Sequence, residues 1–365
     1  MKFTCVRDNL ERACSLAERF TGKNAVLPIL ANILLEVRDR ALIVTGTNLE
    51  CAIQMTVPGT DMRPGKISIP AKVAVSLLQS IREEKIHLEE QGGNLLIKTD
   101  KREARMNGLP ADDFPLMPKI TKTASCLIDV QNLGRGLASV LPAVSLSEFK
   151  PEYTGVLFRL DRRVLRLAAT DTFRLAEQTI ELKGPNEDGQ FSFLIPHRVA
   201  TELVRVLGGE ENIRVSLGDN QVLLEREGMS IISRTIDGQF PDYGNIIPKR
   251  FDTTCFINRA ELIHAVRSSS IFASKLHDVT ITLEGDECEI TSANQEIGAY
   301  KTRIPVSSSG QDIRVSFNYR YLSDGLNILS GEEIFFGMNG ENAPSLLHDR
   351  ESESLLYMVL PIRVA

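Results

Sequence analysis

The chain has 365 residues, which is enough for two or three domains that each bury a core of their own. Its 42% hydrophobic and 25% charged residues exclude a disordered or fibrous protein. The sequence contains no run of about 18 apolar residues, so no membrane span is predicted. The net charge of −6 argues against a uniformly basic nucleic-acid binder, so a role on a polyanion requires an uneven distribution of charge.

The first third of the chain is predicted to open with a strand at Lys2–Val6. Asp8 and Glu11 follow at the spacing of a capping box, which predicts a helix that ends near Phe20. The second half of this third is predicted to repeat the order, with a strand at Lys66–Ile69 and a helix from Pro70 whose apolar face holds Val73, Leu77, Leu78 and Ile81. Alternating apolar residues predict the remaining strands at Ile33–Val37, Ala41–Thr45, Ala52–Val57, Ile86–Glu89, Asn94–Thr99 and Arg102–Asn107.

The same order recurs twice more along the chain. A strand at Leu127–Val130 precedes a predicted helix at 131–141, and Cys255–Ile257 precedes a second capping box, Asn258 to Glu261. Strands are then predicted at Val156–Leu160, Val164–Ala168, Ala176–Glu181, Val279–Leu283, Cys288–Ser292 and Ala299–Ile304. Each unit therefore begins as βαβββ.

Two landmarks give this repeat its period. Asn48, Asp171 and Asn294 are each 123 residues apart, and each follows an alternating apolar run in a predicted Asx turn between two strands. Pro70 and Pro196 are 126 residues apart, and each opens a predicted helix. A period of this length is that of a whole domain. We therefore predict an α+β protein of three similar domains, residues 1–122, 123–250 and 251–365, each with two βαβββ halves and two helices on one face of antiparallel sheets.

The predicted helices carry an excess of basic residues. They span residues 9–20, 70–82, 131–141, 196–207, 258–267 and 318–329, and hold ten Lys and Arg against five Asp and Glu. Their net charge is +5, which leaves −11 for the rest of the chain. If the helices share one face, that face suits the phosphates of a nucleic acid without reading its sequence. Ordinary solvated helix surfaces would give the same count.

The cysteines and the N-terminus predict a reducing compartment. The six cysteines are dispersed, with no CxxC pair, which favours buried thiols. The first residues lack the apolar core of a signal peptide, so we expect a cytoplasmic protein.

Several motifs together closely resemble the bacterial DNA polymerase III beta subunit family, the sliding clamps. They are Met1-Lys2-Phe3-Thr4, Leu27-Pro28-Ile29-Leu30, Thr45-Gly46-Thr47-Asn48-Leu49-Glu50, Ala169-Thr170-Asp171, Arg174-Leu175-Ala176, Asp237-Gly238-Gln239-Phe240-Pro241-Asp242-Tyr243 and Leu360-Pro361-Ile362-Arg363. The resemblance implies the DNA clamp fold and a ring-shaped, head-to-tail homodimer. It also implies the function: the ring encircles duplex DNA, tethers the replicative polymerase and makes replication processive, with no catalysis, cofactor or metal of its own.

The resemblance further implies site residues. Partner proteins, including the polymerase and the clamp loader, would insert a short peptide into a cleft between the second and third domains. Phe173 stands where His is frequent in the family and Tyr153 where an aliphatic residue occurs, so we expect an altered peptide preference. The implied cleft residues are Tyr153, Thr170, Thr172, Phe173, Arg174, Leu175, Pro241, Ile246, Asn318, Tyr321, Ser345, Met358, Leu360, Pro361, Ile362 and Arg363.

Contacts with DNA and between subunits are implied in the same way. The DNA-facing candidates are Lys23, Lys72, His197, Arg198, Arg205 and Lys249. For the dimer seam we expect Met106 in the first domain to face Ile271 and Phe272 in the third, because a stable seam needs apolar contact.

Two other classes of protein are alternatives for a chain with this repeat. An enzyme on a triplicated scaffold is disfavoured, because the glycines of 59–66 miss phosphate-loop spacing and Ser147 and Lys150 match SxxK without its companion motifs. The five histidines show no metal-ligand spacing. A scaffold that binds peptides but no DNA remains the alternative.

Overall fold

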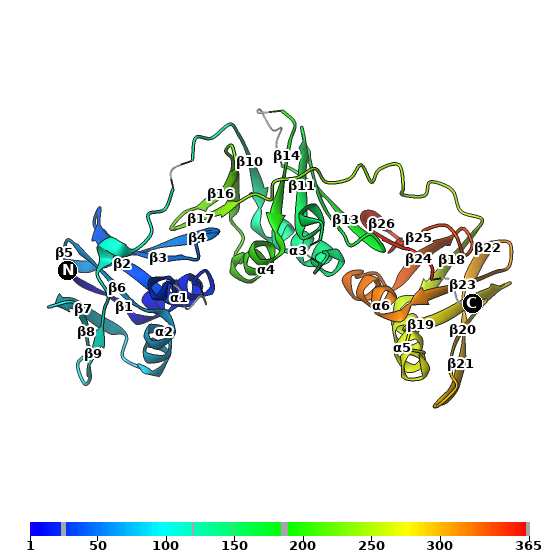
Figure 1. The fold of residues 1–365 in the computed structure, drawn as a ribbon, viewed down its shortest axis with the longest axis horizontal. Coiled ribbons are helices and arrows are strands. Elements are labelled where there is room, and N and C mark those ends of the chain that lie inside the picture. The colour runs from blue at the N-terminus through cyan, green and yellow to red at the C-terminus, as the bar shows by residue number, and fades with distance from the viewer. Residues whose placement is uncertain (23–26, 119, 148, 184–188, 363–365) are drawn as a thin grey trace. The chain divides into compact units, whose positions relative to one another are not determined.

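The computed structural model describes residues 1–22, 27–118, 120–147, 149–183 and 189–362. They form two compact units. Unit 1 comprises Met1–Val130 and Gly208–Thr235, and unit 2 comprises, among the described residues, 131–183, 189–207 and 236–362. Figure 1 shows the elements of both units along the chain.

Unit 1 contains two antiparallel sheets. The smaller sheet has the order β5-β1-β7-β8-β9, and the larger one has the order β10-β15-β16-β17-β4-β3-β2-β6. The strands of the smaller sheet are β1 (Lys2–Val6), β5 (Thr60–Arg63), β7 (Lys85–Gln91), β8 (Asn94–Lys98) and β9 (Glu103–Asn107). Those of the larger sheet are β2 (Asn32–Arg38), β3 (Ala41–Thr47), β4 (Cys51–Val57), β6 (Gly65–Pro70), β10 (Ala124–Asp129), β15 (Asn212–Leu217), β16 (Gln221–Arg226) and β17 (Met229–Arg234).

Helices α1 (Arg7–Arg19) and α2 (Ala71–Ser80) pack against each other in unit 1, and α1 also covers β3 and β4. The buried face of α1 repeats at helical spacing, with Leu10, Ala13, Cys14 and Ala17. The helix approaches β3 so closely that a side chain at Gly46 would place its Cβ 2.1 Å from the backbone oxygen of Ala17. Glycine at 46 is therefore required by packing.

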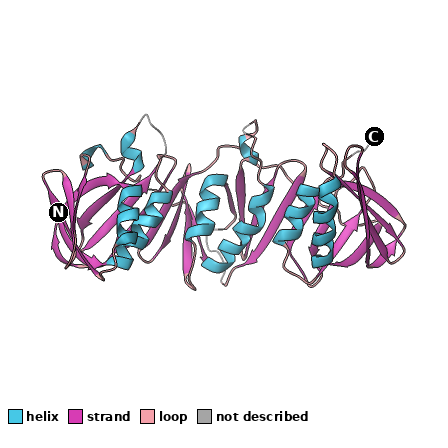
Figure 2. Cartoon of the chain, turned by 90° about the horizontal axis from the view of Figure 1, so that it is seen from below, coloured by secondary structure: helices cyan, strands magenta, loops and turns pink. Residues whose placement is uncertain are grey.

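Unit 2 also contains two antiparallel sheets, of order β14-β11-β12-β13-β26-β25-β24-β18-β22 and β21-β20-β19-β23. Its helices are α3 (Val130–Val140, whose first residue belongs to unit 1), α4 (His197–Val206), α5 (Arg259–Ser269) and α6 (Tyr319–Ile328). Figure 2 shows the helices of each unit lying together on one side of its strands. The strands of unit 2 are β11 (Gly155–Asp161), β12 (Val164–Thr170), β13 (Arg174–Glu181), β14 (Phe191–Pro196), β18 (Thr253–Asn258), β19 (Asp278–Glu284), β20 (Glu287–Asn294), β21 (Gly298–Pro305), β22 (Ser307–Gly310), β23 (Ile313–Asn318), β24 (Glu333–Met338), β25 (Ser345–Asp349) and β26 (Ser352–Val359).

The element order confirms the predicted halves. The strands and helices run β1-α1-β2-β3-β4, then β6-α2-β7-β8-β9, and the pattern recurs from β10 and from β18. In every domain the first strand of each half joins the sheet of the other half, as β1 joins β7 and β6 joins β2. The two halves of a domain therefore cannot separate without breaking strand pairs.

Three local predictions were wrong. Helix α1 begins at Arg7 with Val6 at its N-cap, so Asp8 forms no capping box, whereas Asn258 caps α5 by accepting a hydrogen bond from the backbone nitrogen of Glu261 at 3.0 Å. Val73, predicted on the apolar face of its helix, is 54% exposed, because α2 buries the small side chains of Ala71 and Ala74. Strands β5 and β22 were missed.

The prediction that the six cysteines are buried thiols is confirmed. Burial raises the pKa of Cys5 and of Cys255 to about 12, so neither is a reactive thiolate at neutral pH.

Candidate functional site

The predicted cleft residues gather where β13 and β26 pair. Arg174 pairs with Val359 and Leu175 with Met358, so one sheet runs from the second repeat into the third. The backbone continues in contact beyond the strand, since the nitrogen of Leu360 donates to the oxygen of Phe173 at 2.8 Å. We call this region the β13–β26 seam.

A tight turn opens β13 at the seam. The Oδ1 atom of Asp171 accepts hydrogen bonds from the backbone nitrogens of Phe173 and Arg174, both at 3.0 Å, which confirms the predicted Asx turn. The hydroxyl of Thr170 donates to the oxygen of Arg174 at 2.6 Å, and Thr172 adopts the left-handed conformation with φ of 77°. These bonds fix the direction in which the next two side chains project.

Arg174 joins this turn to helix α6. Its guanidinium donates to Asp171 at 3.0 Å and to Asp324, and it lies 4.4 Å from the centre of the Tyr321 ring. The side chain is 11% exposed. Burial alone would lower the pKa of this guanidinium, but the facing Tyr357, Asp324 and Asp171 outweigh it and the net shift is upward. Arg174 therefore links the turn to α6, and its positive charge is balanced by the carboxylates of Asp171 and Asp324.

Aromatic rings form the rim of the seam. Phe173 is 56% exposed and stacks on Tyr321, with ring centres 6.3 Å apart. Tyr153 meets Phe240 edge to face at 6.4 Å, and Phe240 meets Tyr243 in the same way at 5.8 Å. Such rings offer wide apolar contact at little cost in conformational entropy, which suits a binding surface.

The floor beneath these rings is apolar and continuous. Its buried members come from both sides of the seam and from the connection that holds Tyr243; they are Leu157, Ala168, Leu175, Leu194, Tyr243, Leu346 and Met358. The Tyr243 hydroxyl donates to the buried carboxylate of Glu177, so its polar end is satisfied. Each large apolar side chain buried here contributes about 1.5–3 kcal/mol to folding.

The structure brings most of the predicted cleft residues to this seam, at different depths. Ser345 is fully buried and its hydroxyl has no hydrogen-bond partner among the described residues, whereas Pro241, Leu360, Pro361 and Ile362 are partly exposed. Ile246 is 52% exposed. Arg363 lies outside the described residues.

One of the predicted cleft residues, Asn318, has a structural role. Asn318 caps α6, since its Oδ1 atom accepts from the backbone nitrogen of Arg320 at 2.9 Å. Sequence reasoning missed Asp324, Phe240 and Tyr243 as site residues. Asp324 follows Tyr321 by three positions on one helix, and that spacing is the signal that could have found it.

The described DNA-facing candidates lie at the starts of α2 and α4, in the last turn of α4 and in one connection. Lys72 and Arg198 are exposed at the second positions of α2 and α4, and Lys249 is exposed. Arg205 bonds to Glu202 at 2.8 Å. Burial lowers the pKa of His197 below its ordinary value, so its ring is neutral at pH 7 and offers a hydrogen bond but no charge. Lys23 lies outside the described residues.

Of the predicted dimer-interface residues, Met106 lies on a sheet edge, and Ile271 and Phe272 lie in a short 3-10 helix, Ser270–Phe272. Strand β9 is an edge of the smaller sheet in unit 1, but Met106 points into the chain's own core and is 6% exposed. In unit 2, Ile271 is 66% exposed and Phe272 stacks on Tyr300 of the edge strand β21 at 6.0 Å.

Within the described part of the chain, no group of three or more His, Cys, Asp or Glu side chains could hold a metal ion. No helix there has the length and apolar content needed to cross a membrane.

Comparison with known proteins gives the family. Models of the N-terminal, central and C-terminal domains of the DNA polymerase III beta subunit match residues 1–118, 128–242 and 244–363. The beta sliding clamps of Staphylococcus aureus and Bacillus subtilis are each 28% identical, over 100% of this chain and 99% and 100% of theirs. The crystal structures of the beta subunits of Thermotoga maritima and Pseudomonas aeruginosa match with TM-scores of 0.94 and 0.95, at 27% and 26% identity, over the whole of both chains. The chain therefore belongs to the DNA polymerase III beta subunit family, the beta sliding clamps.

Proposed function

We propose that this chain is a DNA sliding clamp whose homodimeric ring encircles duplex DNA and tethers the replicative polymerase. The observation that carries the proposal is the match to all three clamp domains, in order, along nearly the whole chain. The family consists of processivity factors without catalytic activity of their own. Its members act in DNA replication, and we place this one in the cytoplasm.

The physical basis of the activity is closure combined with weak contact. Phosphate contacts from Lys and Arg are insensitive to base sequence and weaken with salt, so they permit sliding. Closure of the ring prevents escape and holds a bound polymerase at high effective concentration near its primer. We assign the contacts to Lys23, Lys72, His197, Arg198, Arg205 and Lys249, and the domains to residues 1–122, 123–250 and 251–365.

The test of this function is topological. The protein is loaded onto nicked circular DNA by its clamp loader with ATP, washed, and followed after a restriction enzyme linearises the circle. We expect retention on the circle and rapid loss from the linear form. Equal loss from both forms would contradict encirclement and would favour the scaffold that binds only peptides.

For subunit contact we propose that edge strands β9 and β21 meet in a head-to-tail dimer. Both edges have unpaired backbone groups within their own sheets, and Ile271 supplies exposed apolar surface beside β21. Met106 supports β9 from its buried side. Ile271→Asp should halve the mass measured by light scattering. An unchanged dimer would refute this subunit interface.

For partner binding we propose that the β13–β26 seam takes a short peptide from the polymerase, the clamp loader and other partners. The exposed Phe173 and the apolar floor support this assignment. Phe173→Ser combined with truncation after Leu360 should weaken polymerase binding at least tenfold, about 1.4 kcal/mol, while the dimer persists. Leu127→Ser, at a half-exposed position of edge strand β10, is the control. Unchanged affinity in the first variant would refute the site.

A further inference from the structure

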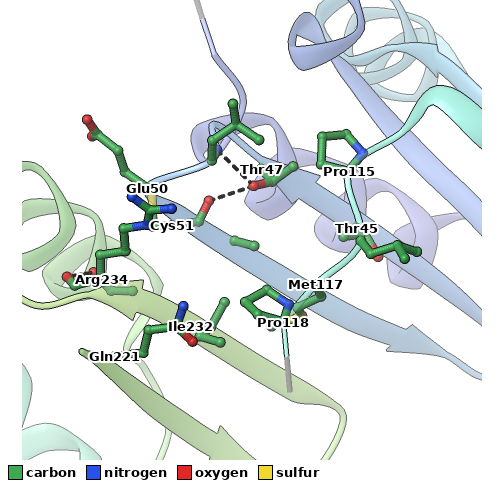
Figure 3. Close-up of a pocket in the computed structure, with 14 residues that line it drawn as sticks. Thr45, Thr47, Glu50, Cys51, Pro115, Met117, Pro118, Gln221, Ile232 and Arg234 are labelled. Carbon is green, nitrogen blue, oxygen red and sulfur yellow. Dashed lines mark hydrogen bonds between the residues drawn. The ribbon is translucent and has the colours of Figure 1, made fainter. Parts of the chain in front are cut away.

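Unit 1 has a cavity that the proposed function does not use. It measures about 320 Å³ and lies where β4 pairs with β17 (Figure 3). Its lining comes from the end of β3 and the turn into β4, from the connection from Pro115 to Pro118, from Gln221 at the start of β16, and from the end of β17. Its volume is at the lower end of the range of ligand pockets, so it admits one or two side chains and excludes a folded domain.

This cavity is the internal repeat of the β13–β26 seam. Two offsets relate its lining to that seam. An offset of 123 positions takes lining residues 47 and 49–52 to residues 170 and 172–175 of the seam. An offset of 126 positions takes lining residues 115, 232 and 234 to residues 241, 358 and 360. Eight lining residues are thus equivalents of residues assigned to the peptide cleft. One backbone bond is repeated too: the nitrogen of Arg234 donates to the oxygen of Glu50 at 2.9 Å, as Leu360 does to Phe173 at 2.8 Å.

The turn geometry is conserved between the two copies. Asn48 Oδ1 accepts from the backbone nitrogens of Glu50 and Cys51 at 3.0 and 2.8 Å, as Asp171 does in the second copy. Leu49 has φ of 76° and Thr172 has φ of 77°. The backbone around the opening of the cavity, which we call its mouth, is therefore the same in both copies. Only the side chains decide what each copy binds.

The side chains of this copy change the chemistry of the mouth. Exposed Phe173 is replaced by exposed Glu50, and apolar Leu360 by exposed Arg234. Neither Glu50 nor Arg234 forms an ion pair within the described residues, although their backbones are bonded to each other. The cavity itself stays largely apolar, with Ala52 and Ile232 both buried beside the prolines of the connection. The mouth thus presents one charge of each sign over an apolar pocket.

We propose that the β4–β17 cavity is a second, diverged peptide site. Its occupant is a short extended segment of a partner protein, with an aliphatic side chain that enters the pocket, an acidic neighbour that pairs with Arg234 and a basic neighbour that pairs with Glu50. The inference rests on the proposed peptide site at the β13–β26 seam, whose repeat it is. Pairs at this exposed mouth are weak and salt-sensitive, so the site suits a transient contact.

The experiment titrates the intact protein into two fluorescein-labelled peptides, Gly-Lys-Leu-Leu-Asp-Gly and its neutral analogue Gly-Gln-Leu-Leu-Asn-Gly, and records anisotropy. At low salt, we expect the charged peptide to bind more tightly than its neutral analogue. Arg234→Glu should weaken it about fivefold with little effect on the analogue, whereas the matched variant Leu360→Glu at the other seam should leave both unchanged. In methyl-labelled protein, the signal of Ile232 should shift and that of Met358 should not.

Two results would overturn the second site. One is absence of binding to the wild-type protein at millimolar concentration. The other is binding that survives Arg234→Glu but is lost in Leu360→Glu, which would place the peptide at the β13–β26 seam. Failure of the proposed function is distinguishable, because retention on circular DNA is measured separately with the Arg234→Glu protein, which we expect to retain it.

Discussion

At the scale of single residues, the β13–β26 seam depends on buried tyrosines with satisfied hydroxyls. Tyr243 donates to Glu177, and Tyr357 donates to the backbone oxygen of Tyr321 at 2.7 Å. Burial, reinforced by the neighbouring carboxylate of Glu177, raises the pKa of Tyr243 above its ordinary value of 10. Burial also raises the pKa of Tyr357. The fold therefore favours the neutral form of both phenols.

This preference predicts alkaline destabilisation. Because the folded-state pKa of Tyr243 is raised, its contribution to stability is complete below pH 10 and is lost as the pH rises above 10. The free energy of unfolding should fall by an extra ~1.4 kcal/mol per pH unit for this group. Tyr243→Phe, measured by urea denaturation between pH 8 and 11, should be less stable than wild type at pH 8 by about 1–3 kcal/mol and approach it at pH 11. Parallel curves would contradict the prediction.

At the scale of elements, two helices begin with the same sequence pattern and use it differently. Asn258 and Glu261 precede α5 as Asp8 and Glu11 accompany the start of α1, but only Asn258 caps its helix. Asp8 lies one position inside α1, where it pairs with Arg7 at 2.9 Å. Both helices follow directly from a strand, but the residue at the junction is Val6 before α1 and Asn258 before α5, so only α5 begins at a residue whose side chain can cap it.

Substitution of the two positions tests this difference. Asn258→Ala should lower the free energy of unfolding by about 1 kcal/mol, because the nitrogen of Glu261 loses its acceptor. Asp8→Ala removes only an exposed pair and should cost no more than about 0.5 kcal/mol. Chemical denaturation under one set of conditions compares them. Equal losses would mean that the observed cap has no energetic weight.

The contact of α1 with β3 gives a sharper element-scale prediction. Gly46→Ala would place a Cβ atom 2.1 Å from the backbone oxygen of Ala17, and a backbone atom cannot rotate away. We expect a loss of about 3 kcal/mol, at the upper end for overpacked cores. Gly208→Ala, where nothing lies within 4 Å of the added atom, is the control and should change stability by under 0.5 kcal/mol. A thermal melt of both variants decides the matter; similar melting temperatures would refute the tight contact.

At the scale of the whole molecule, the repeat was readable from the sequence because it is carried by local signals. Alternation, helical spacing and Asx turns predicted the βαβββ order and most element bounds to within a few residues. Strands β5 and β22 were missed because they are polar, Ser307–Gly310 being only Ser and Gly, and they form by pairing with edges already present. Edge pairing leaves no local pattern to detect.

The candidate site was also only partly predictable from the sequence. The turn at Asp171 was predictable from its own residues, and the gathering of distant residues at the seam was implied only by family resemblance. Arg174 and Asp324 are 150 positions apart on different elements, so the spacing of Tyr321 and Asp324 on α6 could mark Asp324 as a site residue but could not identify Arg174 as its partner. Burial was also hidden, because Met106 looks like an available apolar residue until the register of β8 and β9 turns it inward.

The proposed passage of DNA through the ring predicts a definite response to salt. If Lys72 and Arg198 each neutralise one phosphate, a dimer loses two contacts for every position changed to Ala. The slope of log K against log salt concentration should then fall in magnitude by roughly 1.8 per position, with no dependence on base sequence. Lys66→Ala is the control, because this lysine is already 2.6 Å from the carboxylate of Asp112. The measurement is equilibrium binding to a short duplex between 20 and 200 mM salt, about the range in which phosphate contacts dominate. A slope unchanged in the double variant would mean that these helix starts do not face the phosphates, and the DNA contacts would have to be assigned elsewhere.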